Sequence, residues 1–123
     1  MAGTFVSDTI QNGAGATVPT TTVINGSAKA WVNFNGTGGT IRASYNVSSI
    51  TVSSAGQYTV NFTNAFSDTN YSAIVSAGTG GSNCPNINAP NVAPTTTTFT
   101  FQTFDYAFSG LAAWAYNYAA FYS

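Results

Sequence analysis

Alternation of apolar and polar residues is the clearest pattern along this chain. In residues 57–63 (QYTVNFT), apolar Tyr, Val and Phe alternate with Thr and Asn. Residues 28–35 (AKAWVNFN) have the same period of two, with Val32 and Phe34 on one face and Trp31 on the other. Because successive side chains of a strand point to opposite faces, this pattern predicts strands with one buried face.

Other segments are similarly rich in Thr, Val, Tyr and Phe and poor in helix-forming residues. Turn sequences rich in Gly, Ser and Asn separate them. The further strands that we expect lie at 4–10, 20–24, 40–45, 47–52, 71–77, 95–104 and 111–122. Many short strands joined by turns predict an all-β fold, an antiparallel β-sandwich that is jelly-roll-like.

The chain changes character near residue 28. Residues 1–27 are rich in Gly, Thr and Asn and contain only two short strand candidates, whereas the later segments are longer and alternate more cleanly. We therefore expect a short extended N-terminal arm at residues 1–27 and a β-sandwich head domain at residues 28–123.

The last predicted strand is unusually aromatic. Trp114, Tyr116, Tyr118 and Tyr122 share one face of residues 111–122. Exposed aromatic rings beside amide and hydroxyl groups are typical of sugar-binding surfaces, but rings of this kind also pack between sheets or subunits. For this stripe we favour packing.

Charged residues are scarce. The 123 residues include 2 Lys+Arg, 3 Asp+Glu and no His, with a formal net charge of −1. Two cations cannot neutralise a run of phosphates, so we expect no nucleic-acid partner. No apolar run is long enough to span a bilayer, and we expect no membrane insertion. A β-rich chain with so little charge is poorly protected against edge pairing, which favours a self-associated state.

Catalytic chemistry has few candidates here. Asp8, Asp68 and Asp105 are far apart in the sequence and lie beside turns, where Asp commonly bends the backbone. A serine or Cys84 has no histidine to activate it. One cysteine without a histidine cannot form a zinc site, and SDTN, in which Asp68 and Asn70 could coordinate calcium, reads better as an ordinary turn. We expect no enzyme activity, no catalytic residues, no metal and no cofactor.

The loop at residues 78–94 is the candidate binding segment. It contains three of the four prolines and several glycines, and long loops on rigid scaffolds often carry binding residues. Its asparagines either contact a ligand or satisfy turns, and the sequence favours neither. The candidate ligand- or receptor-contact residues are Asn83, Asn86, Asn88 and Asn91.

Two central segments resemble a known module. AKAWVNFNGTGGTIRASYNVSSIT (28–51) and GQYTVNFTNAFSDTNYS (56–72) resemble a module of tail-fibre and other virion proteins of tailed bacteriophages, especially marine and cyanobacterial ones. DTIQNGAGATVPTTTVINGS (8–27) resembles the short arm that leads into it. The chain after Gly78 carries no such likeness.

This resemblance implies a homotrimeric virion protein that folds in the host cytoplasm and is exposed on the particle surface. It implies an arm that docks onto other virion proteins, for which Phe5, Val6, Ile10 and Val18 are the apolar candidates. We expect a tail-fibre-like adhesin that contacts a host-surface polysaccharide or receptor. The alternative is a capsid decoration or head-fibre protein, and a small depolymerase is disfavoured because acids and bases are lacking.

Overall fold

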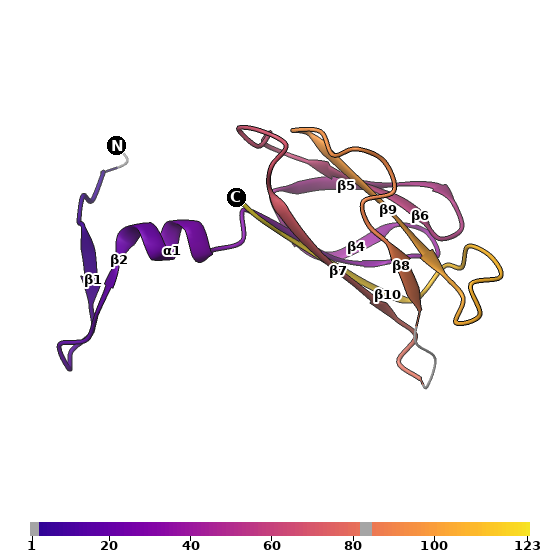
Figure 1. Ribbon diagram of the computed structural model, residues 1–123, viewed down its shortest axis with the longest axis horizontal. Coiled ribbons are helices and arrows are strands. Elements are labelled where there is room, and N and C mark those ends of the chain that lie inside the picture. Colours follow the sequence, from indigo (N-terminus) through magenta and orange to yellow (C-terminus); the bar gives the residue numbers. More distant parts are fainter. Residues whose placement is uncertain (1–2, 82–84) are drawn as a thin grey trace.

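The computed structural model describes residues 3–81 and 85–123. Over these residues the chain forms ten strands, one short helix and three antiparallel sheets, which confirms the all-β prediction. Two of the sheets have four strands each and face one another across a shared core (Figure 1). The third is a two-stranded hairpin that lies apart from them.

The first four-stranded sheet, called sheet 1, has the strand order β4-β3-β10-β7. Sheet 2 has the order β5-β6-β9-β8. The strands of sheet 1 are β3 (Ala30–Asn35), β4 (Thr40–Tyr45), β7 (Ser72–Gly78) and β10 (Tyr116–Tyr122). Those of sheet 2 are β5 (Val47–Ser54), β6 (Gln57–Phe62), β8 (Asn86–Asn88) and β9 (Thr98–Phe104).

The core lies between the two sheets because each inner strand alternates as the sequence predicts. Strand β6 buries Tyr58, Val60 and Phe62, and β3 buries Val32 and Phe34. The core is mainly aromatic, and its rings meet edge to face, the arrangement that the ring quadrupole favours. The other buried apolar side chains are Ala30, Val47, Phe66, Tyr71, Phe99, Phe101, Trp114, Ala119 and Phe121.

The strand order departs from the predicted jelly-roll form. Successive strands of a jelly roll mostly alternate between its two sheets, whereas β3–β4 and β5–β6 are hairpins within one sheet. Tight glycine turns cause this difference: Gly39 has a φ of 70° and Gly56 a φ of 82°, and glycine adopts this left-handed backbone without the steric cost of a side chain. Each turn reverses the chain at once, so the next strand joins the same sheet.

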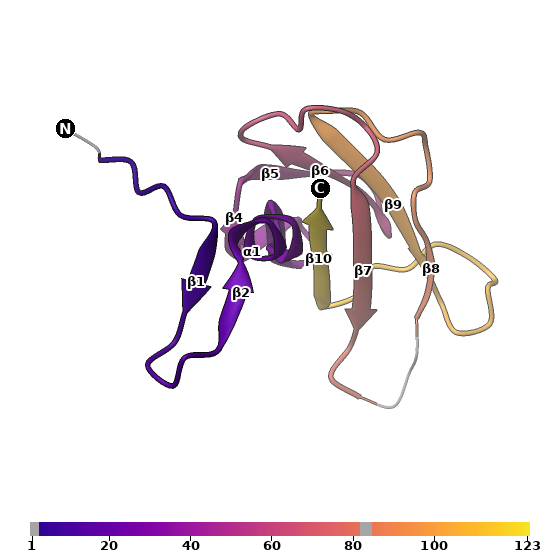
Figure 2. The same ribbon diagram turned by 60° about the vertical axis from the view of Figure 1, so that its left-hand side comes forward.

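Residues 3–27, called the N-terminal segment, lie to one side of the two sheets (Figures 1 and 2). They form β1 (Thr9–Gln11), β2 (Thr17–Pro19) and α1 (Thr20–Gly26). None of these residues is buried. No helix in the described ranges combines the length and apolar character needed to cross a membrane.

The prediction of a strand at residues 20–24 was wrong, because this stretch begins helix α1. Its β-branched residues favour strands only weakly, and there is no neighbouring strand with which they pair. Pro19 fixes the backbone at the start of the helix, and the Ser27 N–H donates to the Val23 carbonyl at its end, with an N···O distance of 3.1 Å. The backbone at the two ends of this stretch therefore favours a helix, and no neighbouring strand favours the alternative.

Candidate functional site: the outer face of sheet 1

The outer face of sheet 2 is a network of polar side chains. The hydroxyls of Thr59 and Thr100, on neighbouring strands, are 3.0 Å apart. The Gln102 amide donates to Gln57 Oε1 at 3.2 Å, and the Asn61 amide donates to a hydroxyl on β5, Thr51 Oγ1, at 3.0 Å. These cross-strand hydrogen bonds give sheet 2 an ordinary solvent-facing surface.

The outer face of sheet 1 is built differently, with large apolar side chains in place of the polar network. Five of them are at least 40% exposed, and together we call them the aromatic face. They are Trp31 (40% exposed), Tyr45 (59%), Ile74 (64%), Tyr116 (40%) and Tyr118 (43%). Strand alternation causes the exposure, since inward-facing residues of the same strands fill the core. An aromatic face of this kind is uncommon on a free surface.

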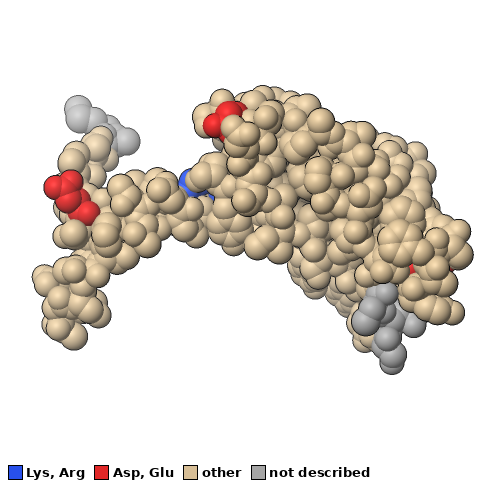
Figure 3. Space-filling view, viewed as in Figure 1, with Lys and Arg blue, Asp and Glu red and all other residues tan. Residues whose placement is uncertain are grey.

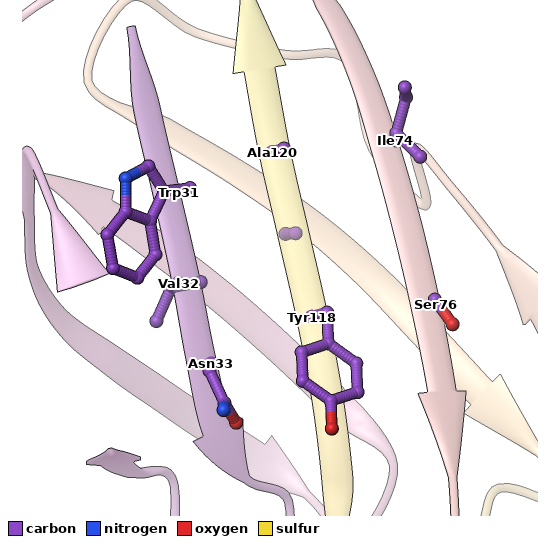
Figure 4. Close-up of a pocket in the computed structure, with 8 residues that line it drawn as sticks. Trp31, Val32, Asn33, Ile74, Ser76, Tyr118 and Ala120 are labelled. Carbon is purple, nitrogen blue, oxygen red and sulfur yellow. The ribbon is translucent and has the colours of Figure 1, made fainter. Parts of the chain in front are cut away.

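A hollow of about 330 Å³ lies at the centre of this face (Figure 4). Ala120 on β10 lies opposite Trp31 on β3 and Ile74 on β7, so a small side chain stands between two large ones. Tyr118 closes the hollow further along β10. The neighbours of Tyr118 across the sheet are Asn33 and Ser76, which bring an amide and a hydroxyl to the rim.

A second hollow, of about 350 Å³, continues along β10 beyond Tyr118. Here Tyr116 lies opposite Gly78, whose lack of a side chain leaves open space beside the ring. Tyr118 lines both hollows. The two hollows are therefore adjacent along the strand.

Arg42 is the only charged residue in the four strands of sheet 1. Its guanidinium carbon lies 4.8 Å from the centre of the Tyr116 ring, a cation–π contact. Its Nη2 donates to the Ala115 carbonyl at 2.7 Å, and Nη1 donates to Asn33 Oδ1 at 3.3 Å. The arginine is thus engaged with neighbouring groups and fixes the position of the Tyr116 ring. Figure 3 shows a molecular surface on which charged side chains form only a few small patches.

The predicted packing of Trp114 is confirmed, but its predicted place within the last strand was wrong. It precedes β10 and is buried, with its indole N–H donating to the Phe104 carbonyl at 3.1 Å. Tyr116 and Tyr118 point outward, so they do not pack between the two sheets, and their packing between subunits stays a prediction. Trp31 and Ile74 complete the face, and sequence reasoning had not joined them to the tyrosines. The pairing of β10 with β3 and β7, which brings them together, has no local sequence signal.

The predicted loop asparagines have local hydrogen-bond partners. Asn86 donates to the carbonyls of Asp105 and Tyr106, at 3.0 and 3.2 Å. Asn88 donates to Asn91 Oδ1 at 3.2 Å, and the Asn91 N–H donates to the Thr100 carbonyl at 2.8 Å. These contacts tie the loop to β9 and to the residues after it. Asn83 and Cys84 lie outside the described residues.

The predicted attachment residues are apolar and mostly exposed. Phe5 is 88% exposed, Val6 86% and Ile10 47%. Val18 is half-buried and lies opposite Ile10 in the β1–β2 hairpin. Sequence reasoning missed Val23 and Ile24 of α1, which are 40% and 59% exposed, although TTTVING carries two adjacent apolar residues as a signal.

Two of the three aspartates stabilise turns by accepting hydrogen bonds from nearby backbone N–H groups. Asp68 Oδ1 accepts the Asn70 N–H at 2.7 Å. Asp105 Oδ1 accepts the Ser109 N–H at 2.7 Å, and the Ser109 hydroxyl bonds its other oxygen. These hydrogen bonds, led by that of the Ser109 hydroxyl, lower the pKa of Asp105. Within residues 3–81 and 85–123, no three Asp, Glu, Cys or His side chains gather as a metal site would require.

No protein-family model matches the chain, and no curated protein or solved structure is significantly similar to it. The function must therefore be inferred from the residues themselves, from the resemblance noted in residues 8–72 and from the two surfaces just described.

Proposed function

We propose that this chain is a structural protein of a bacteriophage virion surface, with a β-sandwich head and an N-terminal arm that attaches it to the particle. One observation carries the proposal: the N-terminal segment has regular secondary structure but buries no side chain. Such a segment gains little stability from its own chain.

Helix α1 has 7 residues, mostly Thr, Val, Ile, Asn and Gly. Isolated helices shorter than about 12 residues are marginal in water even when their residues favour helix, and these do not. A two-stranded hairpin of 3-residue strands is equally weak by itself. Burial of Val23, Ile24 and Phe5 against other virion proteins, or against further copies of the chain, would supply the missing stability.

Self-association fits the same composition. The net charge is −1, and the N-terminal segment exposes five large apolar side chains, Phe5, Val6, Ile10, Val23 and Ile24. Charge repulsion would barely oppose contact between copies. The resemblance implies that the associated state is a homotrimer. The protein would fold in the host cytoplasm and then be exposed on the particle surface.

Within this class we favour a tail-fibre-like adhesin, which contacts a polysaccharide or receptor on the host. The aromatic face supports this choice, because a protein that only coats a shell has no need of a concave aromatic surface. A capsid decoration or head-fibre protein is the second candidate, and the N-terminal segment suits it equally well. In neither role does the chain catalyse a reaction or need a metal or cofactor.

The test separates the two candidates by location. Purified protein is incubated with isolated phage heads, phage tails and host cells, and its mass is measured by light scattering. An adhesin is retained by tails and host cells as a trimer, whereas a decoration protein is retained by heads alone. A monomer that none of the three retains would contradict both.

A double variant, Val23→Ser with Ile24→Ser, tests the arm itself. We expect it to lose retention by the particle, because it removes the apolar surface of α1. Thr21→Ser, on the same exposed helix, is the control and should be retained like the unmodified protein.

A further inference from the structure

We propose that the aromatic face of sheet 1 binds a neutral glycan chain, which lies along β10 with sugar rings against Trp31, Tyr118 and Tyr116. Only the source of that glycan, the host surface, rests on the proposed function. The binding site itself follows from the shape, charge and chemistry of the face. It places the ligand contact on the sheet and not on the loop asparagines, since those that the structure describes make local hydrogen bonds.

The chemistry of the face matches both sides of a sugar ring. A pyranose has a flat face of C–H groups and a rim of hydroxyls. The C–H face stacks on the negative face of an aromatic ring, and the hydroxyls pair with amide and hydroxyl groups. Ligand sites commonly combine an apolar floor with a few polar groups in this way. Here Trp31 and Tyr118 offer rings, and Asn33 and Ser76 offer the polar groups.

The placement of the rings suits a linear ligand. Tyr116 and Tyr118 are two residues apart on β10, which separates their backbones by about 6.8 Å. Trp31 is opposite Ala120, one further step along the same line. Two rings therefore follow β10 and the third lies beside its continuation on β3, with the two hollows between and beside them. A chain of sugars would occupy both hollows in succession.

Charge limits the ligand to a neutral one. The four strands of sheet 1 contain no carboxylate, and their one cation, Arg42, already bonds the Ala115 carbonyl and Asn33 Oδ1. An acidic polysaccharide would meet a single engaged guanidinium. Within the described residues the Asn33 Nδ2 has no hydrogen-bond acceptor, so it is available to a sugar hydroxyl.

The uneven shape of the face also favours a glycan over a second copy of this chain as the bound partner. Ala120 and Gly78 create depressions between exposed side chains, while interfaces between protein subunits need large surfaces of matching shape. The polar outer face of sheet 2 shows that a solvent-facing sheet of this chain can do without aromatic residues.

The experiment is a titration of the full chain with maltohexaose, cellohexaose and mannohexaose, three neutral linear oligosaccharides. Calorimetry measures affinity, and tryptophan fluorescence reports position, because Trp31 is 40% exposed while Trp114 is only 7% exposed. We expect saturable binding to at least one of them, with a Kd on the order of 1 mM or tighter, and a change in Trp31 emission.

Two variants and one control locate the site. Tyr118→Ala removes the ring shared by both hollows, and Gly78→Leu fills the second, where an added Cβ meets nothing within 4 Å. Each should weaken binding at least about tenfold, the loss expected for a central contact. Tyr106→Ala is the control: this ring is 71% exposed in the loop after β9 and lines neither hollow, so affinity should stay within about twofold. Thermal unfolding confirms that each variant is folded.

Three results would overturn the proposal: no saturable binding to any of the three sugars, an equal loss in the Tyr106→Ala control, or a Trp31→Ala variant that turns an oligomer into a monomer. The last would make the face a subunit interface. Retention by virions without sugar binding overturns this proposal alone. Sugar binding by a protein that no phage fraction retains overturns the proposed attachment instead.

Discussion

Trp31 on β3 lies directly opposite Ala120 on β10, and the indole therefore forms one wall of a hollow floored by a methyl group (Figure 4). The same antiparallel pairing places Tyr118 diagonally from Trp31. One register thus sets both the depth of the surface and its aromatic walls. A shift of β10 by one residue would turn Tyr118 and Ala120 into the core and expose Ala119 and Phe121.

The turn between β3 and β4 contains a glycine, Gly36, at which the surrounding core leaves no room for a side chain. A Cβ on Gly36 would lie 2.3 Å from Tyr58 Oη and 2.5 Å from the Trp114 carbonyl oxygen. Gly36→Ala should therefore lower the free energy of unfolding by about 3 kcal/mol, because buried polar groups must shift. Chemical denaturation measures it. Gly38→Ala is the control, since its nearest neighbour would be 3.8 Å away, and an equal loss in both variants would contradict the account.

Phe121 is the centre of the aromatic core. Its ring lies 4.9 Å from that of Phe62 and 5.3 Å from that of Phe99, centre to centre, and the side chain is fully buried. Phe121→Ala should lower the free energy of unfolding by about 4 kcal/mol through lost burial and the remaining cavity. Phe108→Ala removes a ring that is 59% exposed, so the free energy of unfolding should fall much less than in Phe121→Ala. Similar losses in the two variants would contradict the assignment of the core.

Two buried tyrosines should respond oppositely to loss of their hydroxyl. Tyr71 Oη donates to the carbonyls of Thr95 and Thr98, at 2.9 and 3.2 Å, whereas Tyr58 Oη has no hydrogen-bond partner within the described residues. Tyr71→Phe should lower the free energy of unfolding by about 1 kcal/mol. Tyr58→Phe should leave it unchanged or raise it by about 1 kcal/mol, because an unpaired buried group is removed. The reverse order, measured by urea denaturation, would contradict this.

Asp105 should titrate below its ordinary pKa of 3.8, because the Ser109 hydroxyl and N–H bond the charged carboxylate. As the pH falls, Asp105 is protonated in the unfolded chain at a higher pH than in the folded chain. The stabilising contribution is therefore present above the unfolded pKa and is lost as the pH falls through the folded value. Carbon NMR of the carboxyl group measures the midpoint. Ser109→Ala should move it upward, and an unchanged midpoint would contradict the cause.

Removal of residues 1–27 should leave the two-sheet body folded. The N-terminal segment has no buried side chain, and the buried apolar residues all lie between Ala30 and Phe121. We expect the same thermal midpoint for the shortened and full chains, by circular dichroism. A large fall in the midpoint would mean that the segment stabilises the body and is no separate arm.

Much of the body could be predicted because its strands carry a local signal. The alternation in 28–35 and 57–63 identified the strands and their buried faces, including Val32 and Phe34. The segment after Pro19 was mispredicted, since β-branched residues without a sheet neighbour lose their preference. The β8 strand was also missed, because 3 residues are too few to show a period.

The aromatic face was harder to predict because it depends on contacts between distant segments. The stripe of tyrosines in 111–122 was visible in the sequence, but its orientation was not. Trp31 and Tyr118 are far apart in the chain, and only the β3–β10 pairing makes them neighbours. Burial of Trp114 next to exposed Tyr116 also broke the expected alternation, because β10 begins only at Tyr116.

We expect the arm to engage the particle while the aromatic face stays free for a ligand. Acrylamide quenching of tryptophan fluorescence in the particle-bound protein tests it most directly, because Trp31 is exposed and the buried Trp114 serves as an internal reference. If the aromatic face stays free, Trp31 is quenched as strongly on the particle as in the free chain. Loss of that quenching on assembly would contradict it and make the face a contact between virion subunits.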